Sequence, residues 1–174
     1  TAVGYNALEL NTTGTNNTAV GRTALNSNTT GVDNTAVGYL ALQDSTTGVS
    51  NTALGTNCAR NVTTGSNNVA VGTASQISAT SGAQNTTIGR SSGSGITTGS
   101  YNTLIGYNAQ ASAATSVSAV VLGQSVSGAA NYTTVGNGAS DIRAPHGTAT
   151  WSTVSDERYK KDITDSTAGL DFVN

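Results

Sequence analysis

The sequence predicts an all-β fold, a parallel β-roll or β-helix solenoid built from coils of 17 residues. The first observation behind this prediction is a glycine that returns every 17 residues, at Gly4, Gly21, Gly38, Gly55, Gly72, Gly89, Gly106 and Gly123. The second is the alternation of side chains in front of each glycine, which is typical of a short β strand. The third is composition: 9% charged and 5% aromatic residues cannot fill a thick core. A thin, laddered, repetitive architecture satisfies all three.

Each expected strand contains three residues that end just before the repeated glycine. The last of them is always aliphatic, at Val3, Val20, Val37, Leu54, Val71, Ile88, Ile105 and Leu122. The first is Thr or Val, at Thr1, Thr18, Thr35, Thr52, Val69, Thr86, Thr103 and Val120. Because the last residue is never polar, we expect it to point into the core, with the intervening alanines packing tightly on the opposite face.

Two further columns mark the turns. An asparagine precedes most strands, at Asn17, Asn34, Asn51, Asn68, Asn85 and Asn102, and we expect these amides to stack and cap the coils by hydrogen bonds. The triplet Thr-Thr-Gly, first at Thr12–Gly14, predicts a second turn in which glycine takes a positive φ. Each coil is thus expected to hold two glycine-marked corners and two short β segments. At about 4.8 Å per coil, eight coils predict a rod of roughly 40 Å.

The repeat also predicts how the chains associate. A shortened final coil ends at Gly136, 13 residues after Gly123. Leu8, Leu25 and Leu42 form an apolar column early in the chain, and with the alanine face they would leave apolar stripes on a lone solenoid. The simplest remedy is a homotrimer around a three-fold axis. Three side-by-side β-rolls and an intertwined triple β-helix both remain open.

Composition and isolated residues exclude several classes of function. A net charge of -2 and a pI near 5.0 argue against nucleic-acid binding, and no apolar run approaches the ~20 residues of a membrane span. No signal peptide is visible and the chain does not begin with Met, so we expect a piece of a longer product. No cofactor is expected, and no metal, since His146 has no Cys or His companions and the calcium-binding repeat pattern is absent. Cys58 shares the column of Ala7, Ala24 and Ala41, which predicts a small buried hydrophobe.

Charge divides the chain into parts. Residues 1–140 hold six charged side chains, whereas 141–174 hold ten. We therefore predict a repeat shaft over 1–137, a linker over 138–150 broken by Pro145 and Gly147, and a separate module over 151–174.

The repeat copies NTAVGYLAL (34–42) and NNVAVGTAS (67–75) resemble the heads of trimeric autotransporter adhesins. That resemblance implies a left-handed parallel β-roll packed as a trimer. Similar repeats occur in the shafts of viral and phage fibres. Tyr5, Tyr39 and Tyr107 follow the repeated glycine, and we expect them to pack against a neighbouring chain in preference to binding sugar.

The last segment resembles the start of the peptidase S74 (endosialidase-type) intramolecular chaperone, through Ser155-Asp156, Arg158, Lys160, Ile163 and Gly169-Leu170-Asp171. The resemblance implies a domain that assembles a tail-fibre or tailspike trimer and then cuts itself off between Ser155 and Asp156. It also implies that Ser155 is the nucleophile and Lys160 the base. A lysine serves as a base only where burial lowers its pKa toward neutrality. At most this is a single-turnover autoprotease, and the mature shaft is not an enzyme.

These observations favour a structural protein of the virion, a homotrimeric fibre or spike shaft for attachment to a host-surface receptor, with glycans among the candidate receptors. A bacterial trimeric adhesin on the cell surface is the alternative. An ice-binding solenoid is less favoured, because the Thr residues are expected to alternate with aliphatic residues that face the core.

Overall fold

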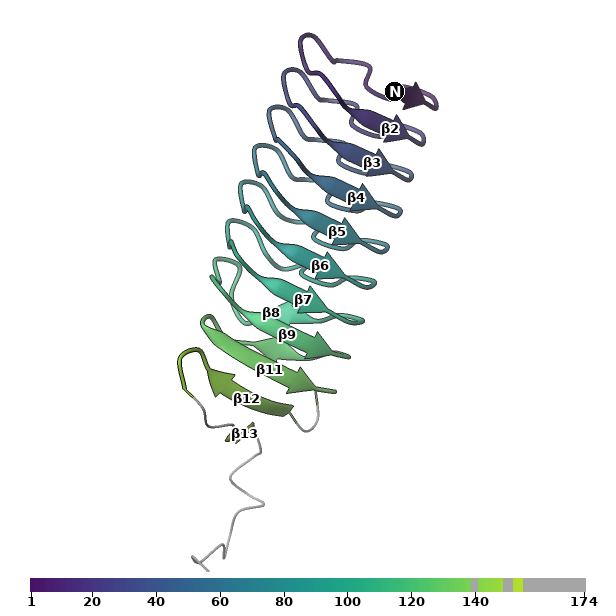
Figure 1. Ribbon diagram of the computed structural model, residues 1–174. Coiled ribbons are helices and arrows are strands. Elements are labelled where there is room, and N and C mark those ends of the chain that lie inside the picture. Colours follow the sequence, from purple (N-terminus) through teal and green to yellow (C-terminus); the bar gives the residue numbers. More distant parts are fainter. Residues whose placement is uncertain (139–140, 149–151, 155–174) are drawn as a thin grey trace, which may run out of the picture.

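The computed structural model describes residues 1–138, 141–148 and 152–154 as an all-β rod without a helix (Figure 1). Its strands are β1 (Ala2–Val3), β2 (Thr18–Val20), β3 (Thr35–Val37), β4 (Thr52–Leu54), β5 (Val69–Val71), β6 (Thr86–Ile88), β7 (Thr103–Ile105), β8 (Gln110–Ala111), β9 (Val120–Gly123), β10 (Ser127–Gly128), β11 (Tyr132–Gly136), β12 (Asp141–Pro145) and β13 (Ser152–Val154). Across these residues no segment forms a helix that could cross a membrane.

The predicted solenoid is confirmed. From β1 through β7 to β9, each strand pairs in parallel with the next, and its residues face those 17 positions further along, as Ala19 faces Ala36. The step from β9 to β11 is shorter, with Val120 facing Thr133. The strands stack as rungs on one face of the rod, with turns at both edges (Figure 1). The chain therefore pairs with itself, coil on coil.

Each coil carries one strand of the main sheet, not the two β segments that we predicted. Among the described residues, a second sheet forms only between β8 and β10, in the last coils. Elsewhere the return path is a chain of turns, in which residues such as Leu25 and Leu42 take a positive φ of 49°. Hydrogen bonds to the next coil hold these turns, for example from Leu25 N to Ala41 O at 3.0 Å.

The orientation of the strand side chains is the reverse of the prediction. The middle residues Ala19, Ala36, Ala53 and Ala70 are fully buried, whereas Leu54 of the aliphatic column is 49% exposed. The interior behind the strands is filled from the turns, by residues that include Ala24, Leu25, Ala41 and Leu42. Since the turn side chains occupy the narrow interior, only a small side chain fits inward from the strand in coils 2–5, and Val or Leu on the flanking positions must face out. Leu25 and Leu42 are fully buried and form no surface stripe.

The asparagine column forms the predicted ladder. Asn34 donates its backbone N–H to Asn17 Oδ1 at 2.9 Å and its side-chain Nδ2 to Gly48 O at 2.8 Å. The same bonds recur at Asn51, Asn68, Asn85 and Asn102. Because these amides are buried, the ladder satisfies backbone groups at every coil boundary that water cannot reach.

The two glycine columns have different physical causes. Gly55 has a φ of +139°, and a Cβ there would lie 2.8 Å from Gly72 O. Gly48 of the Thr-Thr-Gly turn does not have the positive φ that we predicted. A Cβ on Gly48 would instead lie 2.6 Å from Gly65 O and 2.8 Å from Asn51 Nδ2. Lack of space, not backbone conformation, requires glycine in this second column.

The predicted linker is partly a strand. β12 pairs antiparallel with β11, with Ile142 facing Val135, and β13 pairs antiparallel with β12. The antiparallel strands β12 and β13 therefore cover the end of the parallel ladder. The sequence did not predict them, because Pro145 and Gly147 suggested a linker. Pro145 ends β12 and Gly147 follows it with a φ of +83°.

Candidate functional surface

The residues that the chaperone resemblance singles out, Ser155, Asp156 and Lys160, lie outside the described residues, as does most of the 151–174 module. Their assignment as nucleophile, cut site and base stays a prediction. The candidate surface within the described residues is the outer face of the main sheet.

Two columns of outward side chains run along this face. The aliphatic column comprises Val3, Val20, Val37, Leu54, Val71, Ile88, Ile105, Leu122 and Val135. The threonine column, two residues earlier on each strand, comprises Thr1, Thr18, Thr35, Thr52, Val69, Thr86, Thr103, Val120 and Thr133. The exposed fractions include 56% at Val3, 38% at Ile88 and 37% at Ile105. Both columns lie on one face because side chains alternate along a strand.

The size of this face follows from strand geometry. Nine rungs at about 4.8 Å and three residues at about 3.3 Å give an area of about 400 Å². The largest apolar patch of a monomeric protein is about 300–600 Å² and is often functional. None of the residues in the two outward columns is charged. A continuous, charge-free face of this kind is typical of a contact surface.

A third column borders this face just beyond the repeated glycines. Arg22 lies between two rings, 5.8 Å from the centroid of Tyr5 and 5.7 Å from that of Tyr39. Arg90 lies 5.7 Å from the centroid of Tyr107. Each such pair stabilises an exposed site by about 0.5–1 kcal/mol. With Arg22 in this position, Tyr5 is 69% exposed and Tyr39 is 44% exposed.

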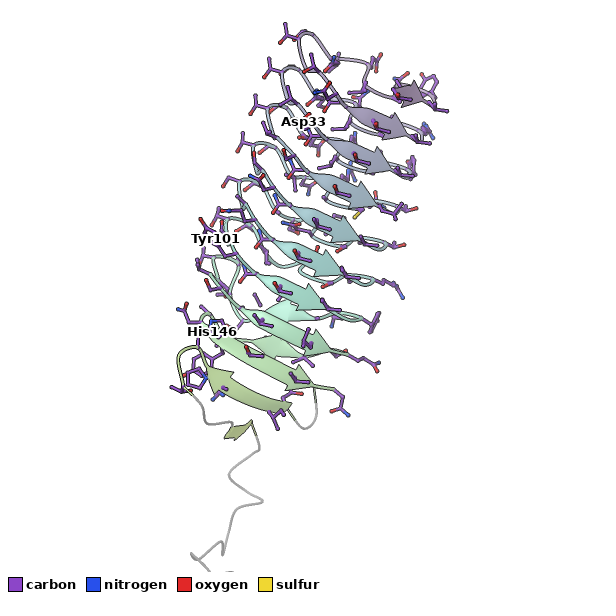
Figure 2. The ribbon with its side chains drawn as sticks, viewed as in Figure 1. Asp33, Tyr101 and His146 are labelled. Carbon is purple, nitrogen blue, oxygen red and sulfur yellow. The ribbon has the colours of Figure 1, made fainter. Side chains whose placement is uncertain are left out.

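The opposite edge of the sheet is polar. Asp33 and Tyr101 lie on the turns that precede β3 and β7 (Figure 2). Asp33 Oδ1 accepts a hydrogen bond from Asn16 Nδ2 at 3.0 Å. The outward face therefore has Arg22 and Arg90 along one edge. The other edge carries a mainly polar column that includes the bonded pair Asn16 and Asp33 and the 57% exposed Tyr101.

A side-chain ladder on the turns was missed by the sequence reasoning. The first Thr of the Thr-Thr-Gly turn donates its hydroxyl to the carbonyl of the Thr one coil on, as from Thr12 to Thr29 at 2.8 Å and from Thr46 to Thr63 at 3.2 Å. The signal was present, since this position is Thr from Thr12 to Thr97. The column joins each coil to the next along this side of the rod.

The remaining candidates are structural. Cys58 is buried and its thiol donates to Ala70 O at 3.1 Å, as its column predicted. Burial raises the pKa of Cys58 to about 12, so the thiol stays neutral and unreactive. His146 Nε2 lies 3.3 Å from Thr133 Oγ1. Within 1–138 and 141–148 no three His, Cys, Asp or Glu residues gather as a metal site would require.

No protein-family model matches the chain, no curated protein matches it, and no solved structure matches it. The outward face is therefore the observation from which function is argued.

Proposed function

We propose that the chain is the shaft of a homotrimeric viral or phage fibre or spike, which holds a host-attachment tip away from the virion. The observation that carries this proposal is the aliphatic column, an apolar stripe along nine consecutive rungs on the outside of a single chain. Water-exposed apolar side chains in unbroken register are unfavourable, and association of identical chains removes all of them from water at once.

Hydrogen bonds that join consecutive coils along the rod also support a shaft. Backbone pairing, buried asparagines and threonine hydroxyls join each coil to the next at the same offset of 17 residues. Few of its side chains are charged, with six in residues 1–140. A solenoid of this kind gains stability from neighbouring coils, so its length can grow without a thicker core.

The self-pairing of the chain favours three side-by-side β-rolls over an intertwined triple β-helix. In an intertwined helix the strand partners would come from other chains, whereas here each strand is paired with the same chain. The aliphatic column makes up about half of the face, and burial of about 200 Å² at ~25 cal/mol/Å² gives about 5 kcal/mol per chain before the cost of association. That cost is about 4–15 kcal/mol, so the threonine and Tyr–Arg columns must also contribute contacts.

Sedimentation equilibrium tests the proposal directly. We expect the folded chain to sediment as a trimer and the variant Leu54→Lys to shift toward monomer, because it places a charge in the middle of the aliphatic column. The matched control Thr64→Lys adds the same charge on an exposed turn and keeps the trimer. A monomer mass for the well-folded wild-type chain overturns the proposal.

Maturation by self-cleavage is a further part of the proposal. In a longer chain that carries a complete chaperone, Ser155 Oγ attacks its own carbonyl carbon while Lys160 takes the hydroxyl proton. That proton passes to the departing amine of Asp156 as the peptide bond breaks, and water then hydrolyses the ester, which leaves a carboxyl group on Ser155. Release of a C-terminal fragment that Ser155→Ala abolishes, with the trimer retained, is the expected result. Cleavage at the same bond in Ser155→Ala contradicts the assignment. A bacterial trimeric adhesin would share the trimer, but it has no need of this segment.

One observation favours a second candidate, an ice-binding solenoid. Thr and aliphatic side chains point outward together from the same rungs, so the alternation that counted against ice binding does not exist. A regular, flat array of hydroxyl and methyl groups could order water if no other chain covered it. This candidate is favoured if the protein is a monomer that lowers the freezing point of its solution and leaves the melting point unchanged. A trimer would bury the face and contradict it.

A further inference from the structure

The interior of the rod changes character between its fifth and sixth coils, residues 69–85 and 86–102. One apolar cluster fills the rod as far as Ala79, and a second begins at Ile96. Between them lies a group of buried polar side chains with a glycine, here named the polar layer. Its members are Ser75, Gln76, Thr87, Ser92 and Gly93.

Each member replaces an apolar residue that the same position carries in earlier coils. Ser75 and Ser92 stand in the column of Ala24 and Ala41, and Thr87 stands in that of Ala19 and Ala36. Gln76 and Gly93 stand in the column of Leu25 and Leu42. Coils 5 and 6 therefore lack the leucine side chain that Leu25 and Leu42 place in the interior, and coil 4 already carries the smaller Ala59 there.

The hydrogen bonds of the polar layer do not replace what is lost. Ser75 Oγ donates to Thr87 Oγ1 at 2.8 Å, Ser92 Oγ to Leu104 O at 2.8 Å, and Gln76 Nε2 to Asn68 Oδ1 at 3.1 Å. Gln76 Oε1 is buried without a partner, as are Asn28 Oδ1 in coil 2 and Ser45 Oγ in coil 3. The difference between the coils is therefore the lost apolar volume, because a net hydrogen bond contributes less than burial of a leucine.

We infer that the polar layer is a built-in joint that divides the rod into two cooperative blocks, coils 1–5 and the coils from residue 86 onward. In a solenoid, stability is close to a sum of coil terms and nearest-neighbour interface terms. The backbone ladder and the asparagine column continue unbroken across this boundary, as at Val69 opposite Thr86 and Asn85 on Asn68. The interface keeps its hydrogen bonds, whereas the buried apolar clusters on its two sides do not join. It is the place where the rod opens first and yields to bending.

This joint does not depend on the oligomeric state. If the proposed trimer forms in register, the polar layers of its chains lie at one height and give the shaft a single flexible level. If the chain is a monomer, the same boundary still separates the two blocks.

Hydrogen exchange on the full chain tests the inference. A uniform solenoid frays from its ends, so its middle amides are the best protected. We expect the reverse at the joint. The amides of Gln76 and Gly89, which bond to Ser92 O at 2.8 Å and Val71 O at 2.8 Å, should exchange at least about tenfold faster than those of Leu25 and Gly38. The latter two occupy the same columns nearer the N-terminus.

A repaired variant provides the second arm. Ser75→Ala, Gln76→Leu, Thr87→Ala and Ser92→Ala together restore the residues of coils 2 and 3 at four of the five positions, and Leu25 shows that leucine is accepted at the positive φ of this column. Gly93 is kept, because a Cβ there would lie 3.2 Å from Leu104 Cδ1. We expect the central minimum in protection to disappear. The matched control, Ala24→Ser with Leu25→Gln, should create a new minimum in coil 2. Maximal protection at Gln76 and Gly89 in the wild-type chain overturns the inference, and so does a minimum that survives the repair.

Discussion

Replacement of Asn51 by alanine removes one rung from the buried asparagine column. The side chain is 1% exposed and makes four hydrogen bonds. Nδ2 donates to Asn34 Oδ1 at 3.1 Å and to Gly65 O at 2.8 Å. Oδ1 accepts from the backbone N and the side-chain Nδ2 of Asn68, each at 3.1 Å. All four bonds are lost in Asn51→Ala.

The remaining bonds determine the magnitude. Asn34 Oδ1 keeps the bond from Asn51 N at 2.9 Å, and Asn68 Nδ2 keeps its bond to Gly82 O at 2.9 Å. The Asn68 N–H and the Gly65 carbonyl each lose their hydrogen bond to the Asn51 side chain. A buried backbone group left unpaired costs about 1–3 kcal/mol, so we expect a destabilisation of about 2–6 kcal/mol.

The assay is urea unfolding followed by circular dichroism, at one protein concentration so that association does not shift the midpoint. The control is Asn61→Ala, whose half-buried side chain is not part of the ladder and should change stability by no more than about 0.5 kcal/mol. Equal midpoints for the two variants would refute the reasoning, because the column would then contribute nothing beyond its backbone pairing.

The other predictions concern glycine and cysteine. Gly55→Ala should destabilise the rod by about 3 kcal/mol or more, because φ is +139° and the new Cβ lies 2.8 Å from Gly72 O. Gly95→Ala, whose Cβ would have only Gln110 Oε1 nearby at 3.4 Å, should unfold close to wild type, and equal losses in both variants contradict the steric argument. Burial raises the pKa of Cys58 from 9.0 to about 12, so the unfolded state releases this proton first and stability falls as pH rises above 9.0. At pH 10 the wild type should have lost about 1.4 kcal/mol relative to its own stability at neutral pH, a loss that Cys58→Ala does not show. Parallel pH profiles of the two proteins rule out this contribution.

The repeat made much of the fold predictable. Every step of 17 residues in the sequence is a step of one coil in the structure, so the parallel ladder and the asparagine column followed directly from residue spacing. Two predictions were wrong, the second β segment of each coil and the positive φ of Gly48. The glycine of the Thr-Thr-Gly turn is required by lack of space, which its place in the sequence does not distinguish from a positive φ. The sequence did not predict the antiparallel strand β12, because it ends at Pro145, a residue that usually interrupts strands.

The candidate surface was only partly predictable. A three-residue strand such as Thr35–Val37 has two faces, and hydrophobicity alone assigns Val37 to the inside. Reversing the assignment moves every flanking side chain to the other face. Nothing in the strand itself distinguishes the two arrangements.

The sequence by itself determined the coil length, the parallel pairing and the amide ladder, since these depend on repetition along the chain. Only the tertiary structure decided which side chains fill the rod. Leu25 and Leu42 enter the interior from the turns and leave width for no more than Ala19 and Ala36 on the strands. The width of the interior therefore forces the aliphatic column outward and creates the surface on which the proposed function depends. The repeat length along the chain does not reveal this width.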